Sequence, residues 1–201
     1  MKRSFCCQRV SKLCRWVLAI LSVALVVGAS QPAFAASDLI LALDFSGEPG
    51  VETYQWLDQK NFVLKHDASN PDKIEIFHAQ GALHLRAKKP AFGMVIHEVD
   101  VLGAKRMLVH WGVADYPDGA SYQQGVDNEA IMIYVFFGHE RQPSGELLVP
   151  DSPYFIGFYL CQAGTDALNQ SYLGHHFKKT GRFICLDHPP EGETAVEEVD
   201  L

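Results

Sequence analysis

The sequence lacks the short motifs that mark the common catalytic sites. It contains neither the Gly-x-Ser-x-Gly elbow of serine hydrolases nor the Gly-x-x-x-x-Gly-Lys loop that cradles phosphates. It also has no His-x-His or His-Glu-x-x-His pair, the kind of spacing that zinc sites use. Any catalytic or metal site would therefore be assembled from residues that lie far apart in the sequence.

The sequence also lacks an apolar run of the roughly 20 residues that a membrane-spanning helix needs. The uncharged, largely apolar run at 16–29 is shorter. It follows a cationic head and precedes Pro32 and the small-x-small sequence Ala33-Phe34-Ala35. This order is typical of a secretory signal peptide. We predict a signal peptide over 1–35, a single β-sandwich domain over 36–201, and a periplasmic or secreted bacterial protein without a membrane anchor after cleavage.

Positive charge is scarce. The chain has 17 Lys and Arg against 24 Asp and Glu, and five of the basic residues but none of the acidic ones lie before residue 36. The part after residue 35 therefore carries 12 basic and 24 acidic residues, a net charge of −12. Nucleic acids and anionic membranes bind cationic patches, so both are excluded as expected partners.

Cysteine is equally scarce after the predicted signal peptide, where Cys161 and Cys185 are the two that remain of five. An oxidising compartment favours one disulfide between them. The alternative is a pair of buried free thiols, because each cysteine follows an apolar run.

Amphipathic helical periodicity is weak throughout, and at most a short helix is expected after Gly164. Two-residue alternation or short continuous apolar runs are common instead, and turn-forming residues separate them. They predict strands at 39–45, 73–78, 82–87, 94–101, 106–114, 130–137, 154–161 and 182–186. Strands without crossover helices predict an all-β fold with antiparallel pairing. We expect a two-sheet, jelly-roll-like sandwich, with a closed β-barrel as the alternative.

The strands at 131–137 and 154–160 are apolar on both faces. A strand covered on one side only would alternate more regularly, so we expect both to be central, with a sheet or a long loop over each side. Gly157 predicts a bulge or a close crossing by another backbone. Trp111, between Val109 and Val113, is expected in the core.

The order of Asp44-Phe45 and the strands at 82–87, 107–113 and 130–137 resembles a bacterial exported β-sandwich family catalogued as a domain of unknown function. The resemblance runs from about residue 39 to the C-terminus and rests mainly on strand pattern. The chain departs from it at His110-Trp111-Gly112, where the family tends to have Trp-x-Trp followed by charged residues. The resemblance implies export and fold but no particular activity.

Glu98 and Asp100 are the nearest approach to a catalytic carboxylate pair. Sandwich-fold glucanases carry Glu-x-Asp-x-x-Glu on one strand face, but here Gly103 stands in the third place. We therefore interpret the two acids as the solvated face of a strand and predict no catalytic residues.

Nine histidines lie after residue 35, and imidazole is the commonest metal ligand. If their strands are neighbours, His84, His97 and His110 would be candidate ligands of a transition metal. Without a specific spacing, scattered surface and cross-strand histidines are the preferred interpretation.

The segment 115–129 is too long for a simple hairpin turn and is rich in acids and aromatics. Its candidate ligand-binding residues are Asp115, Tyr116, Asp118, Tyr122, Asp127 and Glu129. Oxygen ligands suit Ca²⁺, and planar rings stack on sugars. A solvated loop is the alternative. Trp56, in a polar context, is a further candidate for stacking, with a core position as its alternative.

These residues leave two main classes of function as hypotheses. The first is a non-catalytic exported module that binds a glycan or another small polar ligand without a cofactor. The second is a carbohydrate-active hydrolase or lyase whose acids come from separate strands. A histidine and carboxylate metal-binding periplasmic protein is a further alternative.

Overall fold

The computed structural model describes residues 39–126, 128–174 and 176–201. The chain divides into two units, residues 1–42 and 43–201. The predicted signal peptide lies outside the described residues. Residues 39–45 form no strand, so that prediction is wrong. Among the described residues, no helix has the length and apolar character needed to cross a membrane.

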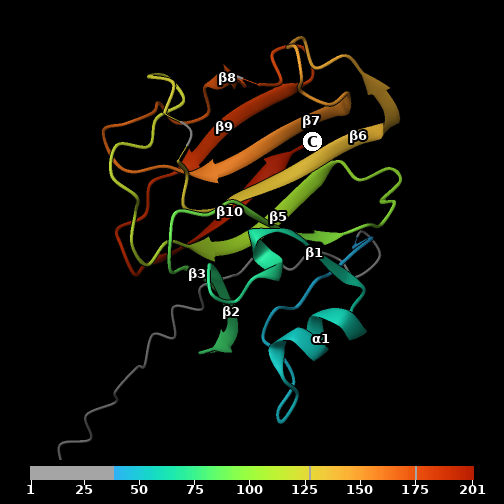
Figure 1. Ribbon diagram of the computed structural model, residues 1–201, viewed down its shortest axis with the longest axis vertical. Coiled ribbons are helices and arrows are strands. Elements are labelled where there is room, and N and C mark those ends of the chain that lie inside the picture. Colours follow the sequence, from blue (N-terminus) through green and yellow to red (C-terminus); the bar gives the residue numbers. More distant parts are fainter. Residues whose placement is uncertain (1–38, 127, 175) are drawn as a thin grey trace, which may run out of the picture. The chain divides into compact units, whose positions relative to one another are not determined.

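The unit from residue 43 onward consists mostly of strands (Figure 1). Its elements in chain order are α1 (Thr53–Gln59), β1 (Phe62–His66), the 3₁₀ helix η1 (Asp67–Ser69), β2 (Ile74–Ala79), β3 (Ala82–Ala87), β4 (Gly93–His97), β5 (Arg106–Gly112), β6 (Met132–Gln142), β7 (Ser152–Leu160), β8 (Ser171–Leu173), β9 (Gly181–Asp187) and β10 (Thr194–Asp200). The all-β prediction is confirmed. The sheets formed by the described residues are open, so the closed-barrel alternative is wrong.

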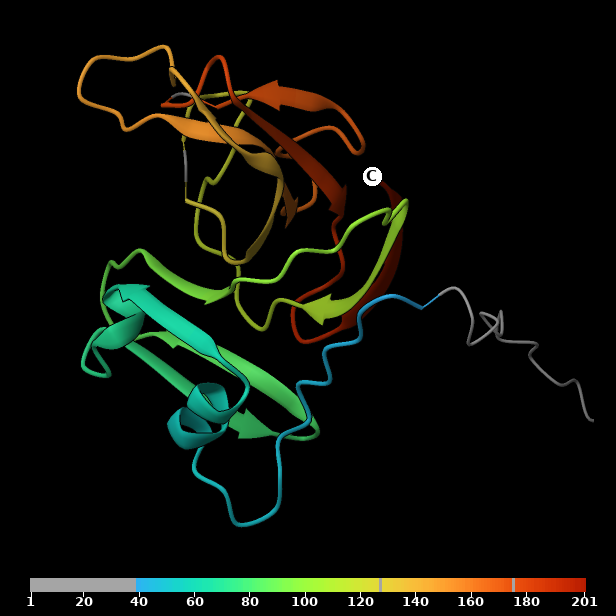
Figure 2. The same ribbon diagram turned by 90° about the vertical axis from the view of Figure 1, so that its right-hand side faces the viewer.

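Residues 45–97 form a group with its own core. Strand β1 pairs antiparallel with β4, and β2 pairs antiparallel with β3. Ile74 and Ile76 of β2 lie in the core, and α1 contacts β1 and β2 (Figure 2). The sequence did not predict α1, whose seven residues are too few to show a helical period. The helix buries Trp56 and Leu57, and Trp56 stacks on Phe62 with ring centroids 6.0 Å apart. Burial against the strands therefore stabilises a helix that would be marginal alone.

The largest sheet has the order β6-β7-β9-β8. The β6–β7 and β8–β9 pairs are antiparallel, but β7 and β9 run parallel, which differs from the antiparallel pairing expected throughout. The residues between β7 and β9 include β8, which pairs on the far side of β9. As a result β7 is central, as predicted, whereas β6 is an edge strand and the prediction of a central position for it is wrong.

Side chains alternate between the two faces of this sheet, and each face has a different cover. On one face, here called the aliphatic face, Phe158, Leu160 and Leu186 pack against Trp111 of β5 and neighbouring side chains. Strands β5 and β10 pair antiparallel with each other, so this face is covered by a second layer of strands. The core position predicted for Trp111 is confirmed, since the residue is 6% exposed.

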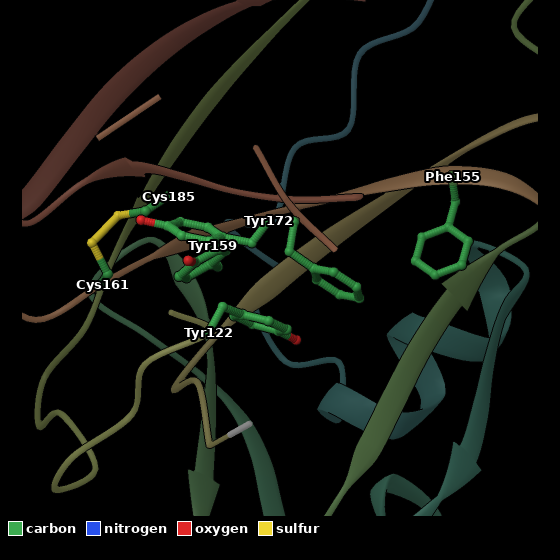
Figure 3. Close-up of a cluster of buried hydrophobic side chains, with 7 residues drawn as sticks. Tyr122, Phe155, Tyr159, Cys161, Tyr172 and Cys185 are labelled. Carbon is green, nitrogen blue, oxygen red and sulfur yellow. A yellow bond between two sulfur atoms is a disulfide. The ribbon is translucent and has the colours of Figure 1, made fainter. Parts of the chain in front are cut away.

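The other face, here called the aromatic face, is covered by non-strand segments. Phe155, Tyr159, Tyr172 and Phe183 of the sheet pack against Tyr122 and Phe177. Figure 3 shows Tyr122, Tyr159 and Tyr172 gathered beside the bond between Cys161 and Cys185. The expectation that a sheet or a long loop covers each side of β7 is therefore confirmed.

Gly157 lies in β7 opposite Phe183 of β9. A Cβ atom at this position would lie 2.9 Å from the ring of Phe183 and would also collide with the sulfur of Met132. The close approach therefore comes from side chains of both neighbouring strands, and not from the backbone crossing that was predicted. The missing side chain makes room for the ring on the aromatic face.

Candidate functional site

A disulfide joins Cys161, just after β7, to Cys185 in β9. Their Cα atoms are 5.7 Å apart, and the sequence separation is 24 residues. The backbone N–H of Cys161 also donates to the carbonyl of Asp187 at 3.1 Å. The predicted disulfide is confirmed, and it ties the end of β7 to β9 at the point where both strands leave the sheet.

Asp166 lies inside the loop that this disulfide closes, and its side chain is buried at 9% exposure. Each carboxylate oxygen accepts one hydroxyl and one backbone N–H. Oδ1 accepts from the Ser121 hydroxyl at 2.8 Å and the Gln123 N–H at 3.1 Å. Oδ2 accepts from the Tyr159 hydroxyl at 2.7 Å and the Tyr122 N–H at 2.9 Å. The carboxylate therefore fastens the segment around Tyr122 to the aromatic face.

Burial by itself would raise the pKa of Asp166, because it removes water from the charged form. The hydrogen bonds from Tyr159, Ser121 and the two backbone N–H groups outweigh that effect and lower the pKa. Burial raises the pKa of Tyr159, and its hydrogen bond to Asp166 raises it further. Asp166 is thus a charged acceptor at neutral pH, and its role is to hold the loop.

The structure divides the candidate residues of 115–129 among different roles. Tyr122 is 7% exposed and stacks on Phe183 at 4.4 Å between ring centroids, so its predicted ligand-binding role is wrong. Glu129 is half-buried. It lies close enough to Tyr159 for its negative charge to raise the pKa of that tyrosine. Asp115 and Asp118 are exposed. Asp127 lies outside the described residues.

Among the described residues of this set, Tyr116 lines a groove. The groove has a volume of about 490 Å³ and is open to solvent. It is lined by Tyr116, Gln162, Ala163, His188, Pro189, Pro190 and Glu191. One wall thus follows Cys161 directly, and the other begins three residues after Cys185. The disulfide joins the chain segments from which both walls extend.

Hydrogen bonds hold the second wall against the start of the loop. The Tyr116 hydroxyl donates to the Pro189 carbonyl at 3.0 Å, and the Tyr116 N–H donates to Oε1 of Glu191 at 3.2 Å. The N–H of Gly192 donates to the Val113 carbonyl at 2.9 Å. Tyr116 also packs on the cluster of the aliphatic face. The ring is therefore fixed on one side, and its position in the groove is preorganised.

The electrostatic environment of the groove is acidic. Burial raises the pKa of Tyr116, and the negative charges of Asp187 and Glu191 raise it further. Burial also raises the pKa of Glu197 in β10, again with a contribution from Asp187. Among the described residues that line the groove, none is Lys or Arg. The groove therefore offers hydrogen-bond acceptors and negative charge beside an aromatic ring.

Trp56 does not take part in a ligand site. It is 3% exposed and packs among Phe45, Phe62 and His78. The predicted stacking role is wrong, because the ring is enclosed by core side chains even though Tyr54 and Gln55 beside it are exposed. Its core alternative is correct.

The three candidate metal ligands lie in three different sheets. His84 in β3 stacks on Phe77, His97 in β4 lies against Phe62, and His110 in β5 hydrogen-bonds Thr194. Within the described part of the chain, no three His, Cys, Asp or Glu side chains gather in a way that could hold a metal ion. The structure thus does not bring the histidines together, and it shows no Ca²⁺ cage around the described acids of 115–129.

Glu98 and Asp100 follow β4 in an exposed segment outside the strands. Asp100 lies 2.9 Å from Nε2 of His139 in β6. Their solvent exposure agrees with the sequence-based interpretation, although they do not belong to a strand.

Comparison with known proteins adds no relative: no family model, curated protein or solved structure matches the chain. The resemblance to an exported β-sandwich family therefore stays a prediction.

Most of the groove and the anchor of the loop were not expected from the sequence. Gln162, His188, Glu191 and Asp166 were not candidates. A signal was present for the groove, because Gln162 follows one cysteine and the turn His188-Pro189-Pro190 follows the other. Once a disulfide is expected, the segments that follow its two cysteines are expected to lie close together.

Proposed function

We propose that the protein is a non-catalytic binding module for a glycan or another small polar ligand, and that the Tyr116 groove is its site. The observation that carries this proposal is the lining itself. A fixed aromatic ring, an amide, an imidazole and a carboxylate face one groove whose walls contain two prolines. Small-ligand sites commonly combine apolar surface with a few polar groups that set orientation.

The geometry suits a sugar ring better than a flat apolar ligand. Tyr116 offers a planar face on which C–H groups of a sugar can stack. Gln162 supplies both donors and acceptors, and Glu191 supplies acceptors for hydroxyl groups. Hydrogen bonds to Pro189 and Glu191 fix the tyrosine beforehand, which lowers the entropy lost on binding.

Export belongs to the same proposal. The disulfide and the acidic composition support a periplasmic or secreted protein, because disulfides persist in oxidising compartments. The jelly-roll arrangement is also kept as a proposal, supported by the packing of β5 and β10 on the four-stranded sheet. The parallel pairing of β7 and β9 is a departure from that arrangement.

A glycan array combined with a reducing-sugar assay tests the proposal on the purified oxidised protein. Binding without sugar release is expected. The variant Tyr116→Ala should lose binding, whereas Tyr54→Ala, at an exposed tyrosine of α1, should keep it. Thermal unfolding of both variants separates a lost site from a lost fold. Absence of binding across glycans and small polar metabolites would overturn the proposal.

A hydrolase or lyase is the second candidate, and one observation favours it. Burial and the charge of Asp187 raise the pKa of Glu197, as expected for a carboxyl group that donates a proton. Sugar release by the wild type and its loss in Glu197→Gln would establish this activity in place of simple binding. Glu198→Gln, at the next residue of β10, is the matched control.

A further inference from the structure

The charge of the groove restricts what it can bind. Glu191 lines it, and Asp187 lies close enough for its charge to act on Tyr116 as that of Glu191 does. The described lining contains no Lys or Arg to offset these carboxylates. A neutral sugar would leave this negative charge without a counterpart, and an anionic one would be repelled.

The hydrogen-bonding capacity of the groove points the same way. The Tyr116 hydroxyl already donates its proton to Pro189, so it can only accept from a ligand. One oxygen of Glu191 accepts the N–H of Tyr116, and a carboxylate oxygen has no proton to donate. The Tyr116 and Glu191 side chains are therefore acceptors, and they complement a group that consists entirely of donors.

The aromatic ring adds a further preference. The face of a tyrosine ring carries partial negative charge and attracts a cation placed above it. A protonated amine has three donors and a positive charge, and it matches the ring and the carboxylate together.

We propose that the ligand of the Tyr116 groove carries a protonated amine, held between the ring of Tyr116 and the carboxylate of Glu191. This inference rests on the proposed binding function and names its ligand class: an amino sugar with a free amine, rather than a neutral or N-acetylated sugar.

Calorimetric titration with two matched oligosaccharides tests this inference. A glucosamine oligomer with free amines and the N-acetylglucosamine oligomer of equal length differ in charge but share the sugar backbone. In slightly acidic buffer the free-amine oligomer should bind about fivefold tighter or better, the size of one solvent-exposed charge pair, and added salt should reduce the difference.

The outcomes separate the two proposals. Equal binding of both oligomers, or tighter binding of the acetylated one, overturns the charge inference and leaves the binding function in place. Binding of neither oligomer, in a protein that also binds no other glycan or small polar metabolite, overturns both. Preference for the free amine supports both.

Two variants locate the effect. Glu191→Gln removes the charge but keeps an oxygen that can accept the N–H of Tyr116, so the wall should stay in place. Its preference for the free amine should fall by about fivefold. Glu193→Gln removes the same charge from an exposed residue in the same turn that does not line the groove, and it should keep the preference. Equal losses in the two variants would contradict a specific contact with Glu191.

Discussion

The two faces of the four-stranded sheet are buried in different ways. On the aliphatic face, strands β5 and β10 form the cover, and their own ladder pairs their backbone groups. On the aromatic face a loop forms the cover, and its backbone pairs only locally, between Ser121 and Val126, among the described residues. There Asp166 accepts the N–H groups of Tyr122 and Gln123, and a disulfide fixes the neighbouring chain. A loop can thus replace a strand layer when side chains supply the missing hydrogen bonds.

This difference predicts how each face responds to substitution. Contacts on the aliphatic face are apolar and close-packed, so their loss should weaken the whole domain. On the aromatic face, the packed rings are supplemented by one buried carboxylate and one covalent bond. Their loss should loosen the cover first, and it should depend on pH or on redox conditions.

The largest effect is expected on the aliphatic face. Phe158 is 1% exposed in the centre of β7, and Phe158→Ala removes a ring that two layers enclose. The free energy of unfolding should fall by about 3–5 kcal/mol. Leu108→Ala is the control, since Leu108 is 55% exposed in β5, and it should cost less than about 1 kcal/mol. Urea denaturation measures both, and equal costs would contradict the two-layer packing.

A smaller loss is expected when the disulfide is removed. The double variant Cys161→Ser, Cys185→Ser frees a segment with a sequence separation of 24 residues, worth about 3 kcal/mol from chain entropy. Amide hydrogen exchange should rise most in residues 115–126 and 161–174. Reducing agent should destabilise the wild type by a similar amount and leave the variant unchanged. Equal sensitivity of both proteins to reductant would count against this account.

The smallest of the three effects is expected at Asp166, and it should depend on pH. Asp166→Asn replaces one carboxylate oxygen with an NH₂ group. Each oxygen of Asp166 accepts a backbone N–H, so the NH₂ group would face another donor at either position. The cost should be about 2 kcal/mol at pH 7.

The sign of the pH dependence follows from the pKa of Asp166, which is lowered in the folded protein. Its contribution to stability is complete above the pKa of the unfolded chain, roughly 4, and is lost as pH falls through the folded-state pKa. Denaturation at pH 7 and pH 3 should therefore show the difference between wild type and variant shrinking in acid. Asp118→Asn, at an exposed acid of the same loop, should be near neutral at pH 7. A difference for Asp166→Asn that does not shrink in acid would refute the role assigned to its charge.

Local pattern was sufficient to predict which strands are buried but not how they pair. The apolar run at 154–160 correctly indicated a strand covered on both sides, and Gly157 indicated close packing. The similar run at 131–137 belongs to an edge strand, because strand order depends on contacts between distant residues that the pattern of one strand does not encode. The parallel pairing of β7 with β9 is non-local for the same reason.

The candidate site shows the same limit at the level of single residues. Tyr116 and Tyr122 lie six residues apart in one acidic loop, yet one lines the groove and the other is buried. Their partners decide the outcome. Glu191 and Pro189 hold the first, and Asp166 and Phe183 hold the second, all from segments more than 40 residues away. Only the disulfide, through compartment and cysteine count, could be expected from composition.

The position of the disulfide also links the groove to the redox state of the protein. Gln162 and His188 are separated by 25 intervening residues along the chain, but the covalent path through Cys161 and Cys185 is far shorter. A newly made chain with free thiols has the residues of the site without the tether between its walls. If the groove binds the proposed ligand, its affinity should rise when the two thiols are oxidised, because the bond then adds to the backbone pairing that holds the walls together.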